Sequence, residues 1–440
     1  MLLLPKEMRR VLVISYYWPP TGGSGVQRWV KFCKFLPSEG WQPVVYTPLN
    51  PEQLAVDESL LEEIPSEVEV LKTEIHEPYE LYRKLTGGKG KAEINPANAQ
   101  KKSWKQKAAL LARGNLFIPD PRVSWVRPSV KFLIEYLKGH PVDAIVTTGP
   151  PQSMHLIGRD LRRAMKRRGM AVPQWIVDFR DPWTDLFYFK HLGLLPPAEQ
   201  IHRHLEQTVL DECDKVIAVT PAVQKDFQAR TSTPVVLITN GYDEDDFRGG
   251  LPDGPQKFTL VHTGLFAADG NPVALWNVLS EKCTADSRFR ESLTIRLAGK
   301  VDKQIYDSLE YYGLSANTVR LGYLEHSATV EEQRRSSLLL LPLRQEPEYA
   351  KVYPGKIFEY LASQRPILGI GQPDSVSAAL LRETLAGDMF DWHDEESLRA
   401  FIDREWMNHL CSEDPAPRAD ITRFSRRALT QQLVSVLKKD

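Results

Sequence analysis

Short runs of β-branched and other apolar residues alternate along the chain with longer stretches in which apolar residues recur every three or four positions. The first run, 10–15, reads RVLVIS. Apolar residues at helical spacing follow it, among them Val26, Trp29 and Val30. We expect further strands in the first half at 43–46, 68–72, 144–147, 175–178, 216–219 and 235–238. This alternation is typical of α/β proteins with parallel sheets.

A stretch rich in Asp, Gly and Pro, 243–256, interrupts the alternation and is typical of a linker. The alternation then restarts, with strands expected at 258–263, 293–298, 319–323, 337–343 and 366–370. The amphipathic segment 418–439 predicts a separate final helix. The pattern therefore predicts two α/β domains, 1–242 and 258–414, and a C-terminal segment, 415–440.

The composition is that of an ordinary globular protein, with 42% hydrophobic and 26% charged residues among 440. The 56 basic and 57 acidic residues give a net charge of −1, which argues against a polycationic nucleic-acid-binding protein. Four cysteines without a CxxC pair predict reduced thiols in a cytoplasmic protein. No apolar run approaches the roughly 18 residues of a membrane span, and the start lacks the apolar stretch of a signal peptide.

Positive charge is nevertheless concentrated in two segments. Segment 83–113 contains nine basic residues and one acidic residue, and segment 159–168 contains six basic residues on a predicted helix. Such basic surfaces bind anionic lipid head groups, so an anionic membrane surface is one predicted partner. The alternative is a solvated loop and a solvated helix face.

Three turns that follow predicted strands in the first half carry candidate site residues. The turn 19–25 (PPTGGSG) leads into a helix whose free N–H groups suit an anion, although it is neither GxGxxG nor a Walker loop. After a later strand, Arg180 and Asp181 are placed to position an acceptor or to take its proton. His155 follows a third strand. The alternatives are a plain tight turn, a structural Arg–carboxylate pair with a helix cap, and a packed core histidine.

The segment 351–362 (KVYPGKIFEYLA) is the most specific candidate in the second half. Gly355 and Lys356 lie where a helix is expected to start, which suits a diphosphate. Glu359 is three residues further and therefore on the same helix face, where a carboxylate suits two vicinal ribose hydroxyls. The alternative is a surface Lys–Glu pair.

These segments together resemble GT-B glycosyltransferases, in particular glycosyltransferase family 4. Five pieces agree in order over nearly the whole chain, namely 22–25, 240–243 with Phe247, 262–264, 321–324 and 354–362. The resemblance implies an α/β GT-B fold of two Rossmann-like domains with parallel sheets facing across a cleft, and a C-terminal helix returning to the first domain. It also implies a retaining transfer of sugar from a nucleoside-diphosphate sugar to a glycan or lipid-linked hydroxyl, without an obligatory metal or other cofactor.

The DFRDPW segment around Arg180 and Asp181 matches a subgroup that makes cell-surface polysaccharides. With the turns described above, the resemblance implies donor binding by Gly23, Ser24, Gly264, Tyr323, Gly355, Lys356 and Glu359, an acceptor side formed by Arg180 and Asp181, and catalytic roles for Asp181, Arg180 and Lys356. The position of His155 after a predicted strand, and not the resemblance, adds it to the acceptor side.

The sequence also departs from this family pattern. Lys351 stands where many relatives have a second Glu, and 265–272 lacks the cation that usually neutralises the leaving diphosphate. Gly149 and Pro150 stand where many relatives have a histidine. Two alternatives therefore remain, a nucleotide-sugar 2-epimerase and a non-catalytic nucleotide-sugar-binding subunit; an NAD-dependent dehydrogenase is weaker because GxGxxG is absent. The DED at 243–245 fits a DxD metal motif by letters, but its position favours a linker.

Overall fold

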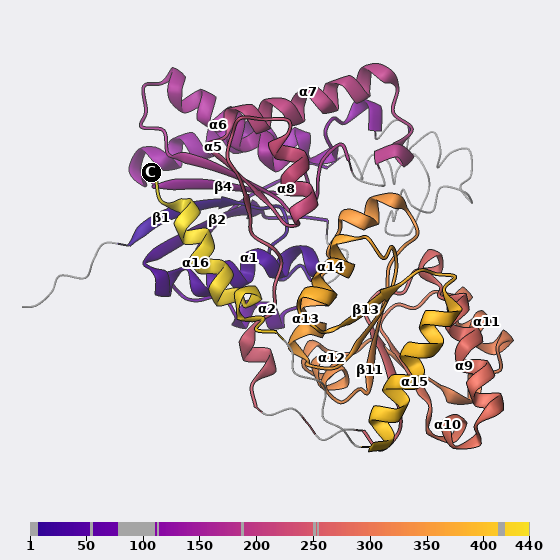
Figure 1. The fold of residues 1–440 in the computed structure, drawn as a ribbon. Coiled ribbons are helices and arrows are strands. Elements are labelled where there is room, and N and C mark those ends of the chain that lie inside the picture. The colour runs from indigo at the N-terminus through magenta and orange to yellow at the C-terminus, as the bar shows by residue number, and fades with distance from the viewer. Residues whose placement is uncertain are drawn as a thin grey trace, which may run out of the picture. The chain divides into compact units, whose positions relative to one another are not determined.

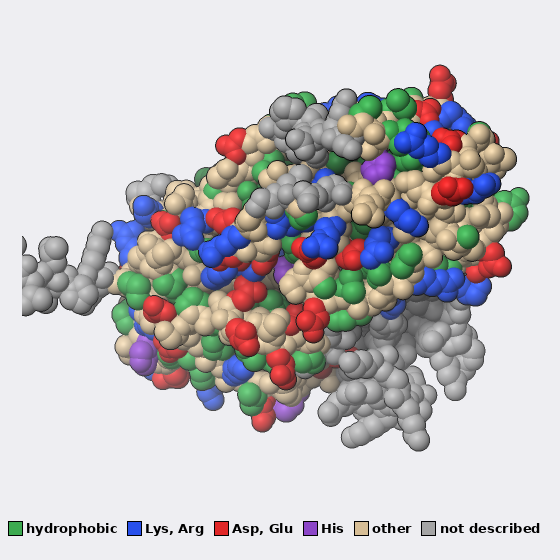
Figure 2. Space-filling model, turned by 90° about the horizontal axis from the view of Figure 1, so that it is seen from below, with side chains coloured by type: hydrophobic (Ala, Val, Ile, Leu, Met, Phe, Trp, Pro, Cys, Tyr) green, Lys and Arg blue, Asp and Glu red, His purple; other side chains and the backbone are tan. Residues whose placement is uncertain are grey.

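The chain folds as two compact units in the computed structural model (Figure 1), which describes residues 8–52, 56–77, 111, 114–185, 189–249, 252, 255–411 and 419–439. Unit 1 comprises Met1–Thr239 and Arg426–Asp440, and unit 2 comprises Asn240–Ser425. Lys and Arg side chains lie among Asp and Glu side chains on the face drawn in Figure 2, in keeping with the net charge of −1.

Unit 1 is built on a seven-stranded sheet in which every neighbouring pair of strands is parallel, in the order β3-β2-β1-β4-β5-β6-β7. The strands are β1 (Arg9–Ile14), β2 (Trp41–Pro48), β3 (Glu69–Thr73), β4 (Ala144–Gly149), β5 (Gln174–Phe179), β6 (Lys215–Ala218) and β7 (Val235–Leu237). All seven strands predicted in the first half are confirmed, with ends that shift by one or two residues.

Helices cover both faces of this sheet, because alternate residues of each strand point to opposite sides. On one side Val11 and Val13 of β1 pack in a core with α1 (Ser24–Phe35) and α16 (Arg426–Leu437). On the other side Leu12 and Ile14 pack in a core with α5 (Val126–Gly139) and α6 (Ser153–Arg167). Among the described residues of the unit, the other helices are α2 (Ser59–Glu62), α7 (Pro196–Glu212) and α8 (Pro221–Gln228). The final helix, expected over 418–439, begins at Arg426 and packs against α1.

A buried ion pair joins α1 to β5 inside unit 1. The Arg28 guanidinium lies 3.0 and 3.2 Å from the two carboxylate oxygens of Asp178, and neither side chain is more than 1% exposed. Trp29 Nε1 and Thr148 Oγ1 also donate to Asp178, at 2.8 and 3.0 Å. Burial opposes ionisation of this carboxyl, but Arg28 and these donors outweigh it and hold the pKa of Asp178 below its usual value. The first Asp of the DFRDPW segment is therefore structural.

Unit 2 repeats the architecture with a six-stranded sheet, also parallel throughout, in the order β10-β9-β8-β11-β12-β13. The strands are β8 (Thr259–Thr263), β9 (Thr294–Ala298), β10 (Thr318–Gly322), β11 (Leu338–Pro342), β12 (Ile367–Ile370) and β13 (Gly387–Phe390). The helices are α9 (Val273–Ala285), α10 (Ser287–Ser292), α11 (Lys303–Tyr311), α12 (His326–Arg334), α13 (Lys356–Ala362), α14 (Val376–Glu383) and α15 (Glu395–Cys411). The first five strands are confirmed predictions; β13 was not predicted, because its sequence GDMF has no apolar run.

The chain enters and leaves unit 2 side by side. The N–H of Tyr242 donates to the carbonyl of Phe424 at 3.1 Å, and Tyr242 forms a parallel bridge with Ser425. Directly after this bridge, Asp243 accepts from the N–H of Asp245 at 3.1 Å and caps a 3₁₀ turn over Glu244–Phe247. The DED letters thus form a capped turn near the start of unit 2.

Candidate functional sites

The carboxyl edge of the first sheet carries three of the predicted turns, and Arg180 joins them. Its main-chain N–H and Nε both donate to the carbonyl of Gly149, at 3.1 and 3.2 Å. Its two terminal nitrogens donate to the carbonyls of Pro150 and Gly25. The guanidinium is therefore directed at main-chain oxygens from the β4–α6 and β1–α1 turns, and it holds the predicted site segments together.

Asp181, next to Arg180 in the chain, is the candidate proton acceptor at this sheet edge. It is half-buried, and no hydrogen bond to its carboxylate comes from the part of the chain that the structure describes. Burial raises the pKa of Asp181 above its usual value, and the neighbouring Arg180 opposes part of that rise. A partly desolvated carboxylate at a sheet edge can accept a proton from a hydroxyl.

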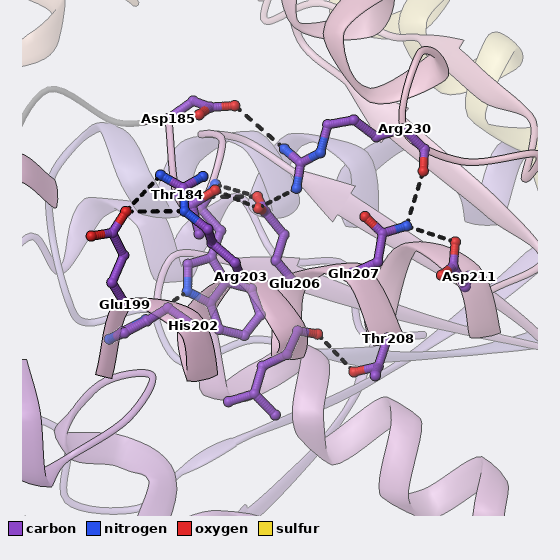
Figure 3. A network of polar contacts seen from close by, with 12 residues as sticks. Thr184, Asp185, Glu199, His202, Arg203, Glu206, Gln207, Thr208, Asp211 and Arg230 are labelled. Atoms are coloured by element: carbon purple, nitrogen blue, oxygen red, sulfur yellow. Dashed lines mark hydrogen bonds and ion pairs between the residues drawn. The ribbon is translucent and has the colours of Figure 1, made fainter. Parts of the chain in front are cut away.

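The turn that follows Asp181 is held by Glu206 of α7, which has no exposed surface (Figure 3). Its carboxylate accepts from the N–H groups of Trp183 and Thr184 at 3.1 and 3.3 Å, and from the Thr184 hydroxyl at 2.6 Å. Arg230 donates to the same carboxylate at 2.6 Å and also reaches Asp185 at 3.3 Å. The sequence analysis missed Glu206; its only local signal is an acidic residue on the buried face of a predicted helix.

His155 lies on α6 beneath the same edge and is fully buried. Its Nδ1 lies 3.0 Å from Thr147 Oγ1, which also accepts from Trp175 Nε1 at 3.1 Å. Burial lowers the pKa of His155 to about 3, so the ring is neutral at physiological pH. The ring packs against Phe179 with centroids 4.6 Å apart. This is the packed-core environment that the sequence analysis weighed against an acceptor role.

The glycine turn places an uncapped helix start at the same edge. Gly23 is the N-cap residue of α1 with φ 104°, a conformation that favours glycine, and no side chain caps the helix. The N–H of Val26 bonds to the Gly23 carbonyl at 3.1 Å. The preceding N–H groups of the first turn lack intrahelical partners, which is the property that suits an anion. The Ser24 side chain lies outside the described part of the structure.

In unit 2, Lys356 reaches the carboxyl edge of β8 from the start of α13. Its Nζ lies 3.3 Å from His262 Nε2 and 3.4 Å from the carbonyl of Leu265. It also lies 3.6 Å from the point where a Cβ on Gly264 would be. Although 265–272 contains no Lys or Arg, a lysine from another element therefore lies beside Gly264. Burial lowers the pKa of Lys356 to about 7, against the opposing effect of Glu359.

His262 is the buried partner of this lysine and was missed as a functional residue, because it lies inside a predicted strand. It has no exposed surface, and its Nδ1 lies 3.1 Å from the carbonyl of Leu340. Since a carbonyl only accepts, Nδ1 carries the proton and Nε2 presents a lone pair to Lys356. Burial and the adjacent lysine hold the pKa of His262 well below its usual value.

Glu359 lies one turn along α13 and is held by Gln333 of α12. Gln333 has no exposed surface; its Nε2 donates to Glu359 at 3.2 Å and to Thr263 Oγ1 at 3.1 Å. Thr263 in turn donates its N–H to the Tyr360 hydroxyl at 3.1 Å. Lys356 and Glu359 therefore each contact a buried neutral side chain, His262 and Gln333 respectively. Like His262, Gln333 was not predicted as a functional residue.

Three glycines with positive φ meet at this edge: Gly264, Gly299 and Gly322. A Cβ on Gly299 would overlap the carbonyl oxygen of Gly264, and the Gly299 N–H donates to the Gly322 carbonyl at 2.6 Å. Tyr323 follows directly and is 82% exposed. The structure thus brings Gly264 and Tyr323 to one edge through Gly299, which the sequence analysis did not single out. Gly355 is exposed and precedes Lys356 at the start of α13.

The basic segment 83–113 lies almost entirely outside the described residues. In segment 159–168, Arg162 pairs with Asp214 at 2.5 Å and Arg163 pairs with Glu212. Arg167 instead lines a groove of about 420 Å³ between α5 and α6. The other residues that line this groove are Arg127, Val130, Lys131, Ile134, Glu135, Asp160, Arg163, Ala164 and Arg168.

No helix among the described residues is long and apolar enough to cross a membrane. Within the same residues, no three His, Cys, Asp or Glu side chains lie close enough to hold a metal ion.

No family model and no curated protein matches this sequence. In structure, the chain is similar to sucrose-phosphate synthase from Thermosynechococcus elongatus, with 14% identity over 97% of this chain and 98% of that chain and a TM-score of 0.58. It is also similar to the E. coli protein described as trehalose-6-phosphate bound with UDP-2-fluoro glucose. The identity is 12% over 98% of this chain and 99% of that chain, with a TM-score of 0.58. A Listeria monocytogenes protein assigned as a UDP-N-acetylglucosamine 2-epimerase gives 11% identity, 98% and 96% coverage, and a TM-score of 0.52.

These similarities concern architecture. The predicted fold class, α/β with two Rossmann-like domains and parallel sheets, is confirmed, and similarity to GT-B proteins extends over nearly the whole chain. At identities of 11–14% the chemistry rests on the side chains themselves.

Replacing Glu206 by Gln tests whether this carboxylate holds the turn after Asp181. The amide would turn its NH₂ group toward donors and lose the pair with Arg230, so we expect a loss of about 2–4 kcal/mol in the free energy of unfolding. Chemical denaturation and faster hydrogen exchange at the Trp183 and Thr184 amides would measure it. Glu199→Gln is the matched control, since Glu199 is on the same helix, 44% exposed and paired with Arg203. Equal effects of the two substitutions would contradict a special role for Glu206.

Proposed function

We propose that this protein is a glycosyltransferase that moves a sugar from a nucleoside-diphosphate sugar to a hydroxyl of a glycan or lipid-linked acceptor. The observation that carries the proposal is the position of Lys356 beside Gly264, with Glu359 on the same helix face and the glycine-rich ends of β8, β9 and β10 alongside. A cation, a carboxylate and exposed main chain at one sheet edge suit a diphosphate, a ribose and a base, in that order.

In this proposal the donor binds to unit 2. Glu359 accepts hydrogen bonds from the ribose hydroxyls, Tyr323 and the neighbouring main chain meet the base, and Lys356 meets the diphosphate. As the glycosidic bond breaks, negative charge grows on the leaving diphosphate, so a cation aimed there stabilises the transition state more than the ground state. Because Lys356 supplies that charge, the proposed reaction needs no obligatory metal or other cofactor.

The acceptor side belongs to unit 1 in this proposal. Asp181 accepts the proton of the attacking hydroxyl, and its raised pKa suits that task near neutral pH. Arg180 positions Asp181 and the β4–α6 and β1–α1 turns through its bonds to main-chain carbonyls. The resemblance adds retention of anomeric configuration, donor contacts from Gly23 and Ser24, and a role in cell-surface polysaccharide synthesis.

The 2-epimerase alternative has one specific support, the structural similarity to a protein assigned that activity. Epimerisation would form a second sugar nucleotide without any acceptor. The non-catalytic alternative rests on the absence of a cation in 265–272, and the position of Lys356 beside Gly264 argues against it. A non-catalytic subunit would bind the donor and turn over nothing.

The first experiment measures which nucleotide binds. We expect one of UDP, GDP, TDP and ADP to stabilise the protein thermally, by about 2.7 kcal/mol at 100 times its dissociation constant. Glu359→Ala should weaken that binding by about 1.5–3 kcal/mol, the range for hydrogen bonds to a charged group. Calorimetric titration measures the difference, with Glu331→Ala of α12 as control because Glu331 is exposed and pairs with exposed Arg335. Unchanged affinity in a folded Glu359→Ala protein would refute the ribose assignment.

A second experiment tests transfer. With the sugar nucleotide that binds and a crude lipid-linked acceptor pool, we expect Asp181→Asn to slow incorporation of labelled sugar by about 10²–10⁴-fold, the usual contribution of a general base. Donor affinity should stay unchanged. Asp185→Asn is the control from the same turn, since Asp185 is exposed and bonded to Arg230. Transfer at the wild-type rate by Asp181→Asn would remove its proposed role, and product without acceptor would favour the epimerase.

We also propose that the protein acts in the cytoplasm at the inner face of a membrane, through segments 83–113 and 159–168. Neutralising Lys101, Lys102, Lys105 and Lys107, or Arg127, Lys131 and Arg167 of the α5–α6 groove, should weaken binding to phosphatidylglycerol vesicles by about 1 kcal/mol per residue. Co-sedimentation at low salt measures this. The control is Lys303→Gln with Arg335→Gln and Arg399→Gln, three exposed residues in ion pairs of unit 2. Equal sedimentation of all variants would rule out the membrane surface as a partner.

A further inference from the structure

We propose that His262 is the positioning residue for Lys356 and that Lys356 takes up a proton from solvent when the donor diphosphate binds beside Gly264. The inference rests on the proposed function and adds to it a coupling between donor binding and protonation. It follows from a contact between two nitrogen bases, Nζ and Nε2, 3.3 Å apart.

In this contact Lys356 donates the hydrogen bond and His262 accepts it. The carbonyl of Leu340 accepts from Nδ1 of His262 at 3.1 Å, so Nε2 has no proton to donate and can only accept from Lys356. The carbonyl of Leu265, 3.4 Å from Nζ, is a second acceptor. A charged ammonium has three N–H donors. Two of them are aimed at these protein acceptors, which leaves the third for a ligand oxygen.

The charge around Lys356 is small. Within the described part of the chain, the titratable groups that face Lys356 are His262 from β8 and Glu359 from its own helix. The side chain that α12 contributes beside Glu359 is the neutral Gln333, and β11 contributes the main-chain carbonyl of Leu340. Glu359 is the one carboxylate in this set, and burial outweighs it. The free site is thus poised between the charged and the neutral forms of the lysine.

Binding of the diphosphate is expected to add a proton to Lys356. Burial lowers the pKa of Lys356 to about 7 and holds that of His262 well below its ordinary value, so Lys356 is the group that changes charge near neutral pH. A bound diphosphate adds negative charge and raises the pKa of Lys356. Binding therefore takes up about one proton well above pH 7 and almost none well below it. The affinity falls as the pH rises from 7 to 9, by up to about tenfold per unit.

The first measurement follows Lys356 without any ligand. In protein labelled with ¹³C at the lysine ε-carbon, we expect the Lys356 signal, assigned with Lys356→Arg, to titrate near pH 7. His262→Leu removes the buried acceptor of the ammonium and should move the midpoint lower, whereas His262→Gln keeps an acceptor oxygen and should move it less. A Lys356 midpoint above pH 9.5 in the wild-type protein would overturn the proposal. Because this test uses the wild-type protein, it stands even if a variant fails to fold.

The second measurement is calorimetric titration of the wild-type protein with UDP-, GDP-, TDP- and ADP-glucose, whose diphosphate esters do not titrate in this range. The titrations are repeated in phosphate-free buffers that differ in ionisation enthalpy, HEPES and Tris at pH 8 and MES and Bis-Tris at pH 6, so that the difference in heat counts protons. We expect an uptake of about 0.9 proton at pH 8 and about 0.1 at pH 6, and a steeper loss of affinity above pH 7 in His262→Leu than in His262→Gln. Binding without proton uptake at pH 8 would overturn the coupling alone. Failure of all four to bind would overturn the proposed function and the coupling together, while the ligand-free titration would still decide whether His262 controls Lys356.

Discussion

The buried contact between Arg28 and Asp178 is the constraint on which the functional edge of unit 1 depends. It joins α1 to β5, and Thr148 at the end of β4 donates to the same carboxylate. Asp178 lies two residues before Arg180, so the pair fixes where β5 ends and where Arg180 begins its bonds to the neighbouring turns. A buried charge left without its partner is strongly destabilising, so this arrangement has little freedom to vary.

Burial shifts the pKa of one candidate site residue in each unit, upward for the carboxyl group in unit 1 and downward for the amine in unit 2. It raises the pKa of Asp181, an acid, and lowers the pKa of Lys356, a base, because in both it favours the neutral form. Each group also keeps one charged neighbour, Arg180 and Glu359 respectively, which limits the shift. Groups tuned towards neutral pH at sheet edges are what proton-transfer and anion-binding chemistry require. The buried His262 next to Lys356 is neutral, and both of its ring nitrogens have hydrogen-bond partners.

The comparison with known structures separates architecture from chemistry. The fold is shared with the structures compared above at 12–14% identity, so this architecture tolerates exchange of most of its side chains. The surroundings of Gly264 illustrate the point: the resemblance implies a basic residue in the loop after β8, whereas here the basic residue beside Gly264 is Lys356 of α13. Position relative to the sheet, and not position along the chain, decides what a residue can do there.

The sequence by itself determined the parallel α/β architecture, twelve of the thirteen strands found among the described residues, and the shared helix face of Lys356 and Glu359. Hydrophobic periodicity and residue spacing suffice for this because they are local properties. The missed strand, Gly387–Phe390, lacks an apolar run and owes its place to pairing with β12. Only the tertiary structure decided that Glu206 holds the turn after Asp181 and that His262 lies beneath Lys356, 94 residues away. These contacts depend on how distant segments pack together, and local sequence patterns do not predict them.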